Sequence, residues 1–422
     1  MAATPHESMP KRCGCWADLK AAYRLLSHPK VRPEAMVAPH LNLTRERCID
    51  QGLVLCVQDD TDLSSAKVAG DAYKQHSTLA VLPDGQVLGM LAASWFERVD
   101  APAGETRQQR EARWRESCVW PEAVTAVGAA PPGCRFVHVA DRAADDLDFI
   151  ERCCDQQVGF IVRARHDRRV NGGEAKLWST LGEQPAAGSM RVDVPRQRDA
   201  RTGRLRPQRK AQVQVRFASV RIEPPWNHPG AHASRSVQAV YVHEPTPPTD
   251  AAPIDWMLLT SEPVDDLAAA LQIIRHYQQR WVIEEWHRAM KEGCRLEQSQ
   301  LDQPADLQRL AALSSVVAVR LIQLRDLADP QREPERANDP AVLKEAVPES
   351  WRVVVAGLAG CAADELTPAR FWLTIARRGG FIGRRNDGRP GWKTIWRGWY
   401  DIQMMVAGYN LAHPTPPAQS CG

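Results

Sequence analysis

The segment Leu53-Val54-Leu55-Cys56-Val57 is a continuous apolar run that ends in the acidic cluster Gln58-Asp59-Asp60-Thr61-Asp62. A second run, Arg135-Phe136-Val137-His138-Val139-Ala140, ends in the same way at Asp141. Short apolar runs that are rich in β-branched side chains are typical of buried strands. We therefore expect two buried strands, each of which ends in an aspartate.

The rest of the chain shows further strand and helix patterns. Period-two alternation between Gln212 and Arg221 predicts a strand with one polar face, and Val264 to Gly293 reads as one long helix. We expect a disordered lead-in over 1–15 and mainly helical structure after 328. Other expected strands cover 77–82, 86–94, 159–163 and 256–260, and other expected helices cover 16–47 with a break at His28-Pro29, 105–116, 145–157 and 305–328.

Two strands that end in aspartate, followed by a later helix that carries Glu284, predict an RNase-H-like arrangement. The expected fold class is α/β, with an RNase-H-like (retroviral-integrase-like) catalytic domain. The Arg-, Pro- and Gly-rich stretch 170–250 would interrupt this domain as a β-rich insertion, and a helical C-terminal domain would follow it.

The composition is that of an ordinary globular protein: 422 residues, of which 44% are hydrophobic and 25% charged. The stretch Met1 to Lys11 lacks the apolar core of a signal peptide. The most apolar run, Leu307 to Leu324, contains Arg309 and Arg320, which favours a buried helix over a membrane span. We expect a cytoplasmic protein without a membrane partner. The eleven cysteines lack paired metal-ligand spacing, so reduced thiols are expected, with a zinc site as the alternative.

The positive charge is concentrated in one segment. The whole chain carries a formal net charge of +3, but residues 163–210 hold thirteen Lys or Arg against five Asp or Glu, a net +8. A basic segment inside a near-neutral protein indicates a local surface for a polyanion. A solvated arginine-rich loop is the alternative.

Carboxylates at strand ends suit phosphodiester chemistry. Two Mg²⁺ ions about 3.5–4 Å apart can activate a water and stabilise the leaving oxygen, and such hard cations take oxygen ligands. Rigid strands would hold Asp59 and Asp141 at an open edge for this purpose. Each aspartate taken alone is also a common turn or capping residue. The neighbouring Asp60 stays an alternative to Asp59.

The helix pattern adds side chains that bind phosphate. Tyr277, Arg280, Glu284 and Lys291 are offset by 0, 3, 7 and 14 residues. At about 100° per residue they fall within an arc of about 60° on a continuous helix. The carboxylate could hold metal while the cations and the phenol grip phosphate oxygens. A solvated helix face with ion pairs four residues apart is the alternative.

The segment from Tyr277 to Lys291 resembles the Tyr-(2)-Arg-(3)-Glu-(6)-Lys signature of the insertion-sequence-four family of bacterial transposases. Other segments resemble motifs of this family in the family's order, from about residue 16 to 412. These are the linker at 21–35, the first-aspartate motif at 57–63, the Asp-Arg-x-Ala-Asp box at 139–145, the strand at 256–264 and the C-terminal segment at 391–399.

The resemblance implies a metal-dependent DDE transposase, an endonuclease and DNA strand transferase of an insertion sequence. Asp59, Asp141 and Glu284 would be the catalytic residues and would hold two Mg²⁺ (or Mn²⁺) ions per active site. Cut-and-paste transposition would proceed by a nick at a transposon end, a hairpin intermediate and strand transfer into target DNA. The double-stranded DNA partners are the transposon ends and the target, bound by a homodimer.

The resemblance also implies DNA contacts. Tyr277, Arg280 and Lys291 would clamp phosphates near the cleaved end. Trp256 would stack against a base flipped out of the duplex, with Trp281 as a second candidate, and core packing is the alternative for both tryptophans. The basic segment would lie along the DNA, where Arg163 and Arg165 would touch the backbone.

The expected domains follow from the same resemblance. They are a remnant of the N-terminal helical DNA-binding region with its linker (1–47), the RNase-H-like catalytic domain (48–169 and 251–300), the β-strand insertion subdomain (170–250) and the helical dimerisation domain (301–422). The chain begins almost at the family's linker, which puts end recognition in question. An N-terminally shortened regulator that inhibits a full-length transposase by heterodimerisation is therefore one alternative. An RNase-H-like host nuclease is another. A bacterial, nucleoid-associated location in the cytoplasm is expected.

Overall fold

The computed structural model describes residues 8–413 except 14, 69–71, 195–196, 199–204, 207, 226–232, 249–251, 331–333, 385–386 and 388. The chain divides into two compact units. Unit 1 comprises Met1–His40, Asp62–Lys74 and Glu284–Gly422, and unit 2 comprises Leu41–Thr61 and Gln75–Ile283.

A mixed sheet of nine strands forms the framework of unit 2, with the order β3-β2-β1-β4-β5-β11-β10-β9-β6. The central strands β1, β4 and β5 run parallel, and β5, β11, β10, β9 and β6 are joined by antiparallel pairing. The bounds are β1 Gly52–Asp62, β2 Tyr73–Val81, β3 Val87–Glu97, β4 Cys134–Ala140, β5 Gly159–Arg163, β6 Gly188–Val194, β9 Arg209–Ile222, β10 Arg235–His243 and β11 Asp255–Thr260. This α/β arrangement is the RNase-H-like fold that the two Asp-terminated runs predicted.

The insertion between β5 and β11 adds strands to this sheet. β10 pairs along β11 from Gln238 opposite Thr260 to His243 opposite Asp255, and β9 and β6 follow. β11 is thus a central strand, because its backbone groups are paired on both sides. The short strands β7 (Gln197–Arg198) and β8 (Leu205–Arg206) pair only with each other. The strands β6, β9 and β10 of the predicted insertion therefore continue the sheet of unit 2.

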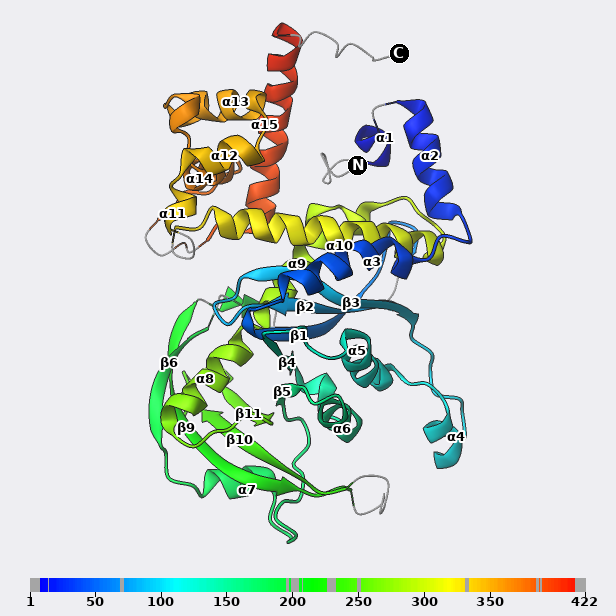
Figure 1. The fold of residues 1–422 in the computed structure, drawn as a ribbon, viewed down its shortest axis with the longest axis vertical. Helices are drawn as coiled ribbons and strands as arrows, with labels where there is room; N and C mark the ends of the chain where they lie inside the picture. Colours follow the sequence, from blue (N-terminus) through cyan, green and yellow to red (C-terminus); the bar gives the residue numbers. More distant parts are fainter. Residues whose placement is uncertain are drawn as a thin grey trace. The chain divides into compact units, whose positions relative to one another are not determined.

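Helices cover both faces of the sheet in unit 2 (Figure 1). On one face, α5 (Val119–Val127), α6 (Leu147–Asp155) and α7 (Leu177–Gly182) contribute Trp120, Phe149 and Leu177 to the main buried cluster. On the other face, α8 (Leu267–Gln278) lies against β4, β5, β9 and β10. α8 begins with an N-cap, in which the Asp266 carboxylate accepts a hydrogen bond from the Ala269 N–H at 2.7 Å. A short helix α4 (Arg107–Ala112) falls inside the expected helical range 105–116.

The predicted long helix over 264–293 was wrong as a single element. The chain forms α8, a turn at Gln279 and Arg280, α9 (Trp281–Arg288) and a π-helical turn η3 (Ala289–Gly293). At the turn the backbone hydrogen bonds join residues three apart instead of four. The Arg280 N–H donates to the Tyr277 carbonyl at 3.0 Å, and the Ile283 N–H donates to the Arg280 carbonyl at 3.2 Å. Hydrogen bonds between residues three apart wind the chain more tightly than an α-helix. The side chains of α9 therefore do not continue the angular spacing of the side chains of α8.

Unit 1 is largely helical. Among the described residues its longest helix is α10 (Pro304–Leu327), and it also contains most of α9 together with α1 (Met9–Arg12), α2 (Trp16–Ser27), α11 (Pro334–Ala337), α12 (Pro340–Ala346), α13 (Glu349–Ala359), α14 (Pro368–Arg378) and α15 (Trp392–Ala412). α3 (Pro33–Arg47) crosses from unit 1 into unit 2. The helix α1 lies in the stretch that was expected to be disordered.

α10 is one helix in the described part of the chain that is long and apolar enough to cross a membrane. Most of its apolar window is buried, and its buried side chains include Leu307, Arg309 and Leu310. The Arg309 guanidinium donates to the carbonyls of Val31 at 2.6 Å and Leu26 at 2.8 Å. These contacts fit the core helix that the two arginines in the run predicted.

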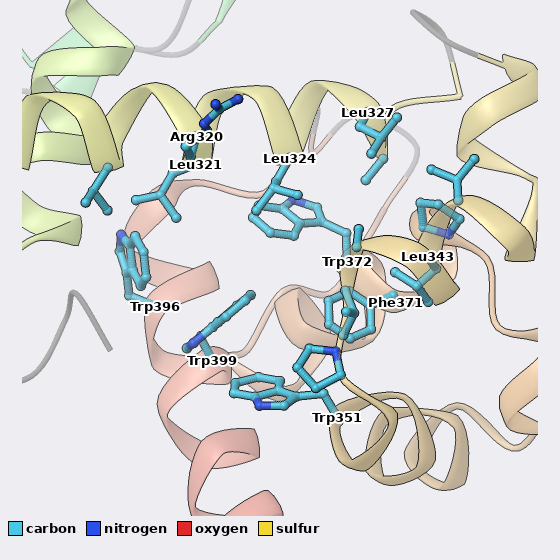
Figure 2. Close-up of a pocket in the computed structure, with 17 residues that line it drawn as sticks. Arg320, Leu321, Leu324, Leu327, Leu343, Trp351, Phe371, Trp372, Trp396 and Trp399 are labelled. Atoms are coloured by element: carbon cyan, nitrogen blue, oxygen red, sulfur yellow. The ribbon is translucent and has the colours of Figure 1, made fainter. Parts of the chain in front are cut away.

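The C-terminal helices of unit 1 line an apolar pocket of about 340 Å³. Figure 2 shows Leu321 and Leu324 of α10 on one side, with Trp372 of α14 and Trp396 and Trp399 of α15 around the space. The indole rings contact one another at centroid distances of 6.4 Å for both Trp372–Trp399 and Trp396–Trp399. Aromatic packing thus joins α14 to α15.

Candidate active site

Asp59 lies near the end of β1. The strand continues through Asp62, so the expectation that the acidic cluster ends it was wrong. A strand is held by its backbone hydrogen bonds to β2 and β4, and polar side chains do not interrupt that pairing. Burial changes at this point instead, from fully buried residues through Gln58 to half-buried ones from Asp59 on. The strand thus delivers Asp59 to the edge of the core.

Asp141 follows the last residue of β4, as the sequence predicted. β1 and β4 are parallel neighbours, with Val57 opposite Val139. Asp59 and Asp141 each lie two residues beyond this pair, and neighbouring strands are about 4.8 Å apart. The two aspartates therefore come to the same end of adjacent strands. Asp141 also caps the short helix η2 (Arg142–Ala144), because its Oδ1 accepts a hydrogen bond from the Ala143 N–H at 2.7 Å.

Arg280 joins this edge from the turn between α8 and α9. Its Nη1 lies 3.1 Å from Asp59 Oδ2, and the side chains are 16% and 13% exposed. Asp59 Oδ1 accepts the Asp60 N–H at 3.0 Å. Asp62 forms a different ion pair, with Lys74 at 3.5 Å. Of the three acids in the cluster, Asp59 is the one that this ion pair links to the Tyr–Arg–Glu–Lys segment.

Tyr277 is buried beside the same group. Burial raises the pKa of its phenol, and the negative charge of Asp141 raises this pKa further, whereas Arg280 and Arg163 lower it. Arg163, at the end of β5, hydrogen-bonds Tyr277 and donates from Nη2 to the Asp255 carbonyl at 2.8 Å. Burial lowers the pKa of Arg163. Unit 2 thus gathers two acids, two arginines and a protonated phenol at one edge of its sheet.

The two predicted stacking tryptophans differ in environment. Trp256 of β11 is half-buried, and its ring meets Tyr277 edge to face at a centroid distance of 5.6 Å. Trp281 is 42% exposed at the start of α9. Trp256 is therefore part of the group around Tyr277, and Trp281 offers an aromatic surface to solvent. Arg165 is exposed, and its backbone N–H donates to Asp145 Oδ2 at 2.6 Å.

Glu284 and Lys291 belong to unit 1. Glu284 is half-buried in the first turn of α9. Lys291 lies in the π-helical turn, with its Nζ 3.6 Å from Glu297 Oε1. The single stripe calculated for Tyr277, Arg280, Glu284 and Lys291 assumed one continuous helix, and the break at Gln279 and Arg280 shows that this assumption was wrong. Tyr277, Glu284 and Lys291 are on three separate helical segments, and Arg280 is in the turn between the first two.

The carboxylate oxygens fit a divalent ion chemically. Asp59 and Asp141 offer the hard ligands that Mg²⁺ and Mn²⁺ prefer, and each oxygen can accept more than one partner. Within the described residues, no group of three or more His, Cys, Asp or Glu is placed to hold a metal ion. The convergence of Asp59, Asp141 and Glu284 on a pair of ions stays a prediction.

The basic segment 163–210 is partly neutralised by acids elsewhere in unit 2. Arg168 is bonded to Asp145 with Nη1 to Oδ1 at 2.5 Å, and Arg209 is paired with Glu244, with Nη2 to Oε2 at 2.8 Å. Both acids are buried. These two cations hold loops together, so the net +8 overstates the charge available to DNA. Arg196, Arg201 and Arg204 lie outside the described residues, and for Arg198 and Arg206 the structure describes the backbone alone.

A buried polar bridge beside Asp59 was not predicted. The Gln58 amide donates from Nε2 to His138 Nδ1 at 2.6 Å, and His76 Nε2 lies 3.3 Å from Gln58 Oε1. The three residues come from β1, β4 and β2 and are completely buried or nearly so. Burial lowers the pKa of His138 to about 3, so its ring is neutral. The three positions are far apart in the sequence, and no sequence signal pairs them.

The ten cysteines in the described part of the chain are free. Burial raises the pKa of Cys48 and of Cys294 to about 12, which keeps these thiols protonated. Reduced thiols were the expectation.

Three family models match the chain. "Transposase DDE domain" matches residues 134–319, "Transposase Tn5 dimerisation domain" matches 365–415 and "Transposase DNA-binding" matches 1–31. The RNase-H-like sheet, with acids at the ends of its central strands, agrees with the first match. Fold and matches define the chain as a DDE transposase, with a DNA-binding and a dimerisation region. It belongs to the Tn5-like transposases of the insertion-sequence-four family.

Proposed function

We propose that the chain catalyses cut-and-paste transposition, with Asp59, Asp141 and Glu284 as the metal-binding catalytic residues. The proposal covers cleavage at transposon ends through a hairpin intermediate and strand transfer into target DNA. The observation that supports it best is the Asp59–Arg280 ion pair of 3.1 Å. This pair joins the first acidic strand to the segment that carries Glu284, although more than 200 residues separate them in the sequence.

Two Mg²⁺ or Mn²⁺ ions, when bound, would supply the Lewis acidity that activates a water or 3′-hydroxyl and stabilises the leaving oxygen. The protein's own contribution is to hold the reacting phosphate. Arg280 and Arg163 bring positive charge to the edge of the sheet where Asp59 and Asp141 lie. Tyr277 stays a protonated donor because its pKa is raised, and it can hydrogen-bond a phosphate oxygen.

Trp256 is suited to receive a base that leaves the duplex. A hairpin end requires a tight strand reversal, which is easier when one base unstacks and finds another aromatic surface. Trp256 is half-buried and fixed against Tyr277, so the stacking surface would lie next to the phosphate clamp. Trp281 is the second candidate, and Lys291 and Arg165 would add phosphate contacts.

The match of residues 1–31 to a transposase DNA-binding model favours binding of specific transposon ends over general nuclease activity. The match of residues 365–415 to a dimerisation model supports a homodimer on DNA. Binding of both ends by one dimer would place the proposed enzyme with the bacterial nucleoid in the cytoplasm.

The proposal predicts that Glu284→Ala abolishes cleavage of the element's own ends in Mg²⁺ and in Mn²⁺. Losing one of three catalytic carboxylates should reduce the rate by several orders of magnitude, because the remaining binding alone gives little acceleration. The measurement is a plasmid cleavage assay with the element's terminal sequences, with DNA binding followed by gel shift.

Asp59→Asn and Asp60→Asn distinguish the two adjacent acids in the same assay. We expect Asp59→Asn to abolish cleavage and Asp60→Asn to retain it. Wild-type protein that is folded and binds the ends, yet cuts them in neither metal, would contradict the proposal. Protein that does not cut but depresses transposition by a full-length relative would instead be a regulator that acts by heterodimerisation.

A further inference from the structure

The second glutamate of the Glu284-Glu285 pair has its own partner in unit 1. Arg325 Nη1 of α10 lies 2.6 Å from Glu285 Oε2. The Arg325 side chain is only 7% exposed, and its Nη2 also lies 3.2 Å from Asp326 Oδ1. Because Arg325 is buried, its charge-assisted contact with Glu285 is screened less by solvent than a fully exposed surface pair. Arg325 therefore fixes the rotation of α9 about its own axis.

This fixed rotation decides where Glu284 points. Adjacent residues of a helix differ by about 100°, so holding Glu285 against α10 turns Glu284 to a neighbouring face. Two further contacts hold the same segment. The Trp286 indole donates to the Ser315 carbonyl at 3.2 Å, and Cys294 Sγ lies 3.8 Å from the Ser314 carbonyl. α10 thus holds α9, the helix that carries Glu284, in a fixed orientation.

Arg325 also connects α10 to the region that matches the dimerisation model. Its guanidinium carbon lies 5.2 Å from the ring centroid of Trp392, the first residue of α15. Arg389, shortly before α15, pairs with Asp326 at 3.7 Å and with Asp329. At the other end of the segment, a Cβ built on Gly293 would lie 2.4 Å from Trp396, so η3 and α15 are in close contact. The helix matched to dimerisation and the helix that carries Glu284 share Arg325.

We infer that Arg325 is a positioning residue for the transposase reaction: it ties down Glu285 and so orients Glu284. Arg325 contacts no DNA in this role. It also neutralises the carboxylate that lies next to the proposed metal ligand, which prevents Glu285 from competing for the ion. The inference rests on the proposed function, because it assumes that Glu284 is a catalytic residue.

The test compares Arg325→Met and Glu285→Gln with Arg320→Met, a matched control on the exposed side of the same helix. We expect the first two variants to lower kcat for end cleavage about 10- to 100-fold, as for residues that support metal ligands, with KM for DNA unchanged. The Arg320→Met control should keep wild-type kcat. The double variant should be no worse than the more damaging single variant, because both remove one shared interaction.

A readout without cleavage complements the kinetics. The rise in Tm that Mn²⁺ causes should shrink in Glu285→Gln and Arg325→Met and stay as in the wild type for Arg320→Met. If Arg325→Met does not fold, Glu285→Gln carries the test, since it preserves size and its side chain is 27% exposed in the wild type. Wild-type kcat and Mn²⁺ response in folded Glu285→Gln would overturn the inference.

Glu284→Ala, measured in parallel, distinguishes failure of the proposed function from failure of the role assigned to Arg325. If Glu284→Ala still cleaves, the proposed function fails and the assignment of Arg325 fails with it. If Glu284→Ala is inactive while Glu285→Gln and Arg325→Met behave as the wild type, only the assignment of Arg325 fails.

Discussion

At the scale of single residues, charge and burial decide which groups can take part in chemistry. Tyr277 is buried between Asp141, Arg163 and Arg280, and the net effect is a raised pKa. The phenol is therefore a hydrogen-bond donor at every pH at which a transposase would work. In the proposed function, Arg280 would supply positive charge and Tyr277 a directed hydrogen bond to a phosphate oxygen.

Tyr277→Phe should weaken the hold on the reacting phosphate by about 0.5–1.5 kcal/mol, or about two- to tenfold in kcat/KM, because one hydrogen bond is lost. Folding stability gives a second check. A phenol whose folded pKa lies above its ordinary 10.0 contributes stability below pH 10 that is lost as the pH rises through the folded value. Urea unfolding of the wild type should thus show an extra loss above pH 10 that is absent in Tyr277→Phe. Equal alkaline profiles would contradict the assignment.

The buried bridge of Gln58, His76 and His138 predicts acid sensitivity. Burial lowers the pKa of His138 from 6.5 to about 3. Between these two pH values the unfolded chain binds a proton at His138 and the folded chain does not. Stability from this histidine is fully present above pH 6.5 and is lost as the pH falls towards 3. Unfolding of the wild type between pH 7 and 4 should show this loss, and His138→Gln should show a flatter profile.

The exposed His28 provides the control for this measurement. His28→Gln should keep the wild-type slope of stability against pH, since this side chain is exposed and lies outside the buried bridge. A slope that is unchanged in His138→Gln would show that other groups cause the acid loss.

At the scale of elements, α14 and α15 touch through glycines. A Cβ on Gly398 would lie 1.8 Å from the Ile375 carbonyl oxygen, and one on Gly379 would lie 1.8 Å from the Thr394 carbonyl oxygen. Both obstacles are backbone atoms, which cannot rotate away as a side chain can. The two helices therefore approach more closely than any residue with a side chain would allow.

Gly398→Ala should consequently force α14 and α15 apart and destabilise unit 1, by about 1–3 kcal/mol as for overpacked cores. Gly408→Ala in the same helix is the matched control, because nothing lies within 4 Å of its Cβ. That change should stabilise the helix by up to about 1 kcal/mol through propensity. Thermal unfolding of the two variants should move Tm in opposite directions, and a common direction would refute the argument.

How far the sequence predicts each element depends on whether the signal is local. The strands at 135–140 and 159–163 are apolar runs, and both were predicted nearly to the residue. β10 and α5 were missed, since β10 follows an Arg-, Pro- and Gly-rich stretch and α5 has a Pro in its first turn. The break at Gln279 and Arg280 contains no helix breaker, and the contact that accompanies it, with Asp59, comes from the distant strand β1.

For the candidate site too, a residue could be predicted only where its sequence signal is local or belongs to a family motif. Asp141 was predictable because a strand ends directly before it, and a family motif marked Tyr277 and Arg280. The grouping of Arg163 with Tyr277, and of Arg325 with Glu285, depends on strand and helix packing over long sequence distances. Such pairs carry no spacing that a single sequence could reveal. The net charge of the basic segment does not show that Arg168 and Arg209 are paired, because their partners Asp145 and Glu244 lie outside it.

At the scale of the whole molecule, the exposed side of α15 is the candidate surface for a second copy. Tyr400, Met404 and Leu411 are 41%, 51% and 84% exposed, and at about 100° per residue they fall within about 40° of one another. A stripe of large apolar side chains left in solvent is typical of an interface. It lies within residues 365–415, which match the dimerisation model.

Met404→Glu should weaken self-association at least tenfold, because a charge would be buried without a partner in the middle of the stripe. Asn410→Glu adds the same charge to the same helix at an exposed position about 80° or more from the stripe, and it should leave association unchanged. Sedimentation velocity over a concentration series, with and without end DNA, measures both. Since a transposase dimer holds two ends, the monomeric Met404→Glu protein should also lose paired-end cleavage while its unfolding curve stays that of the wild type. Dimers of normal affinity in Met404→Glu would place the interface elsewhere on unit 1.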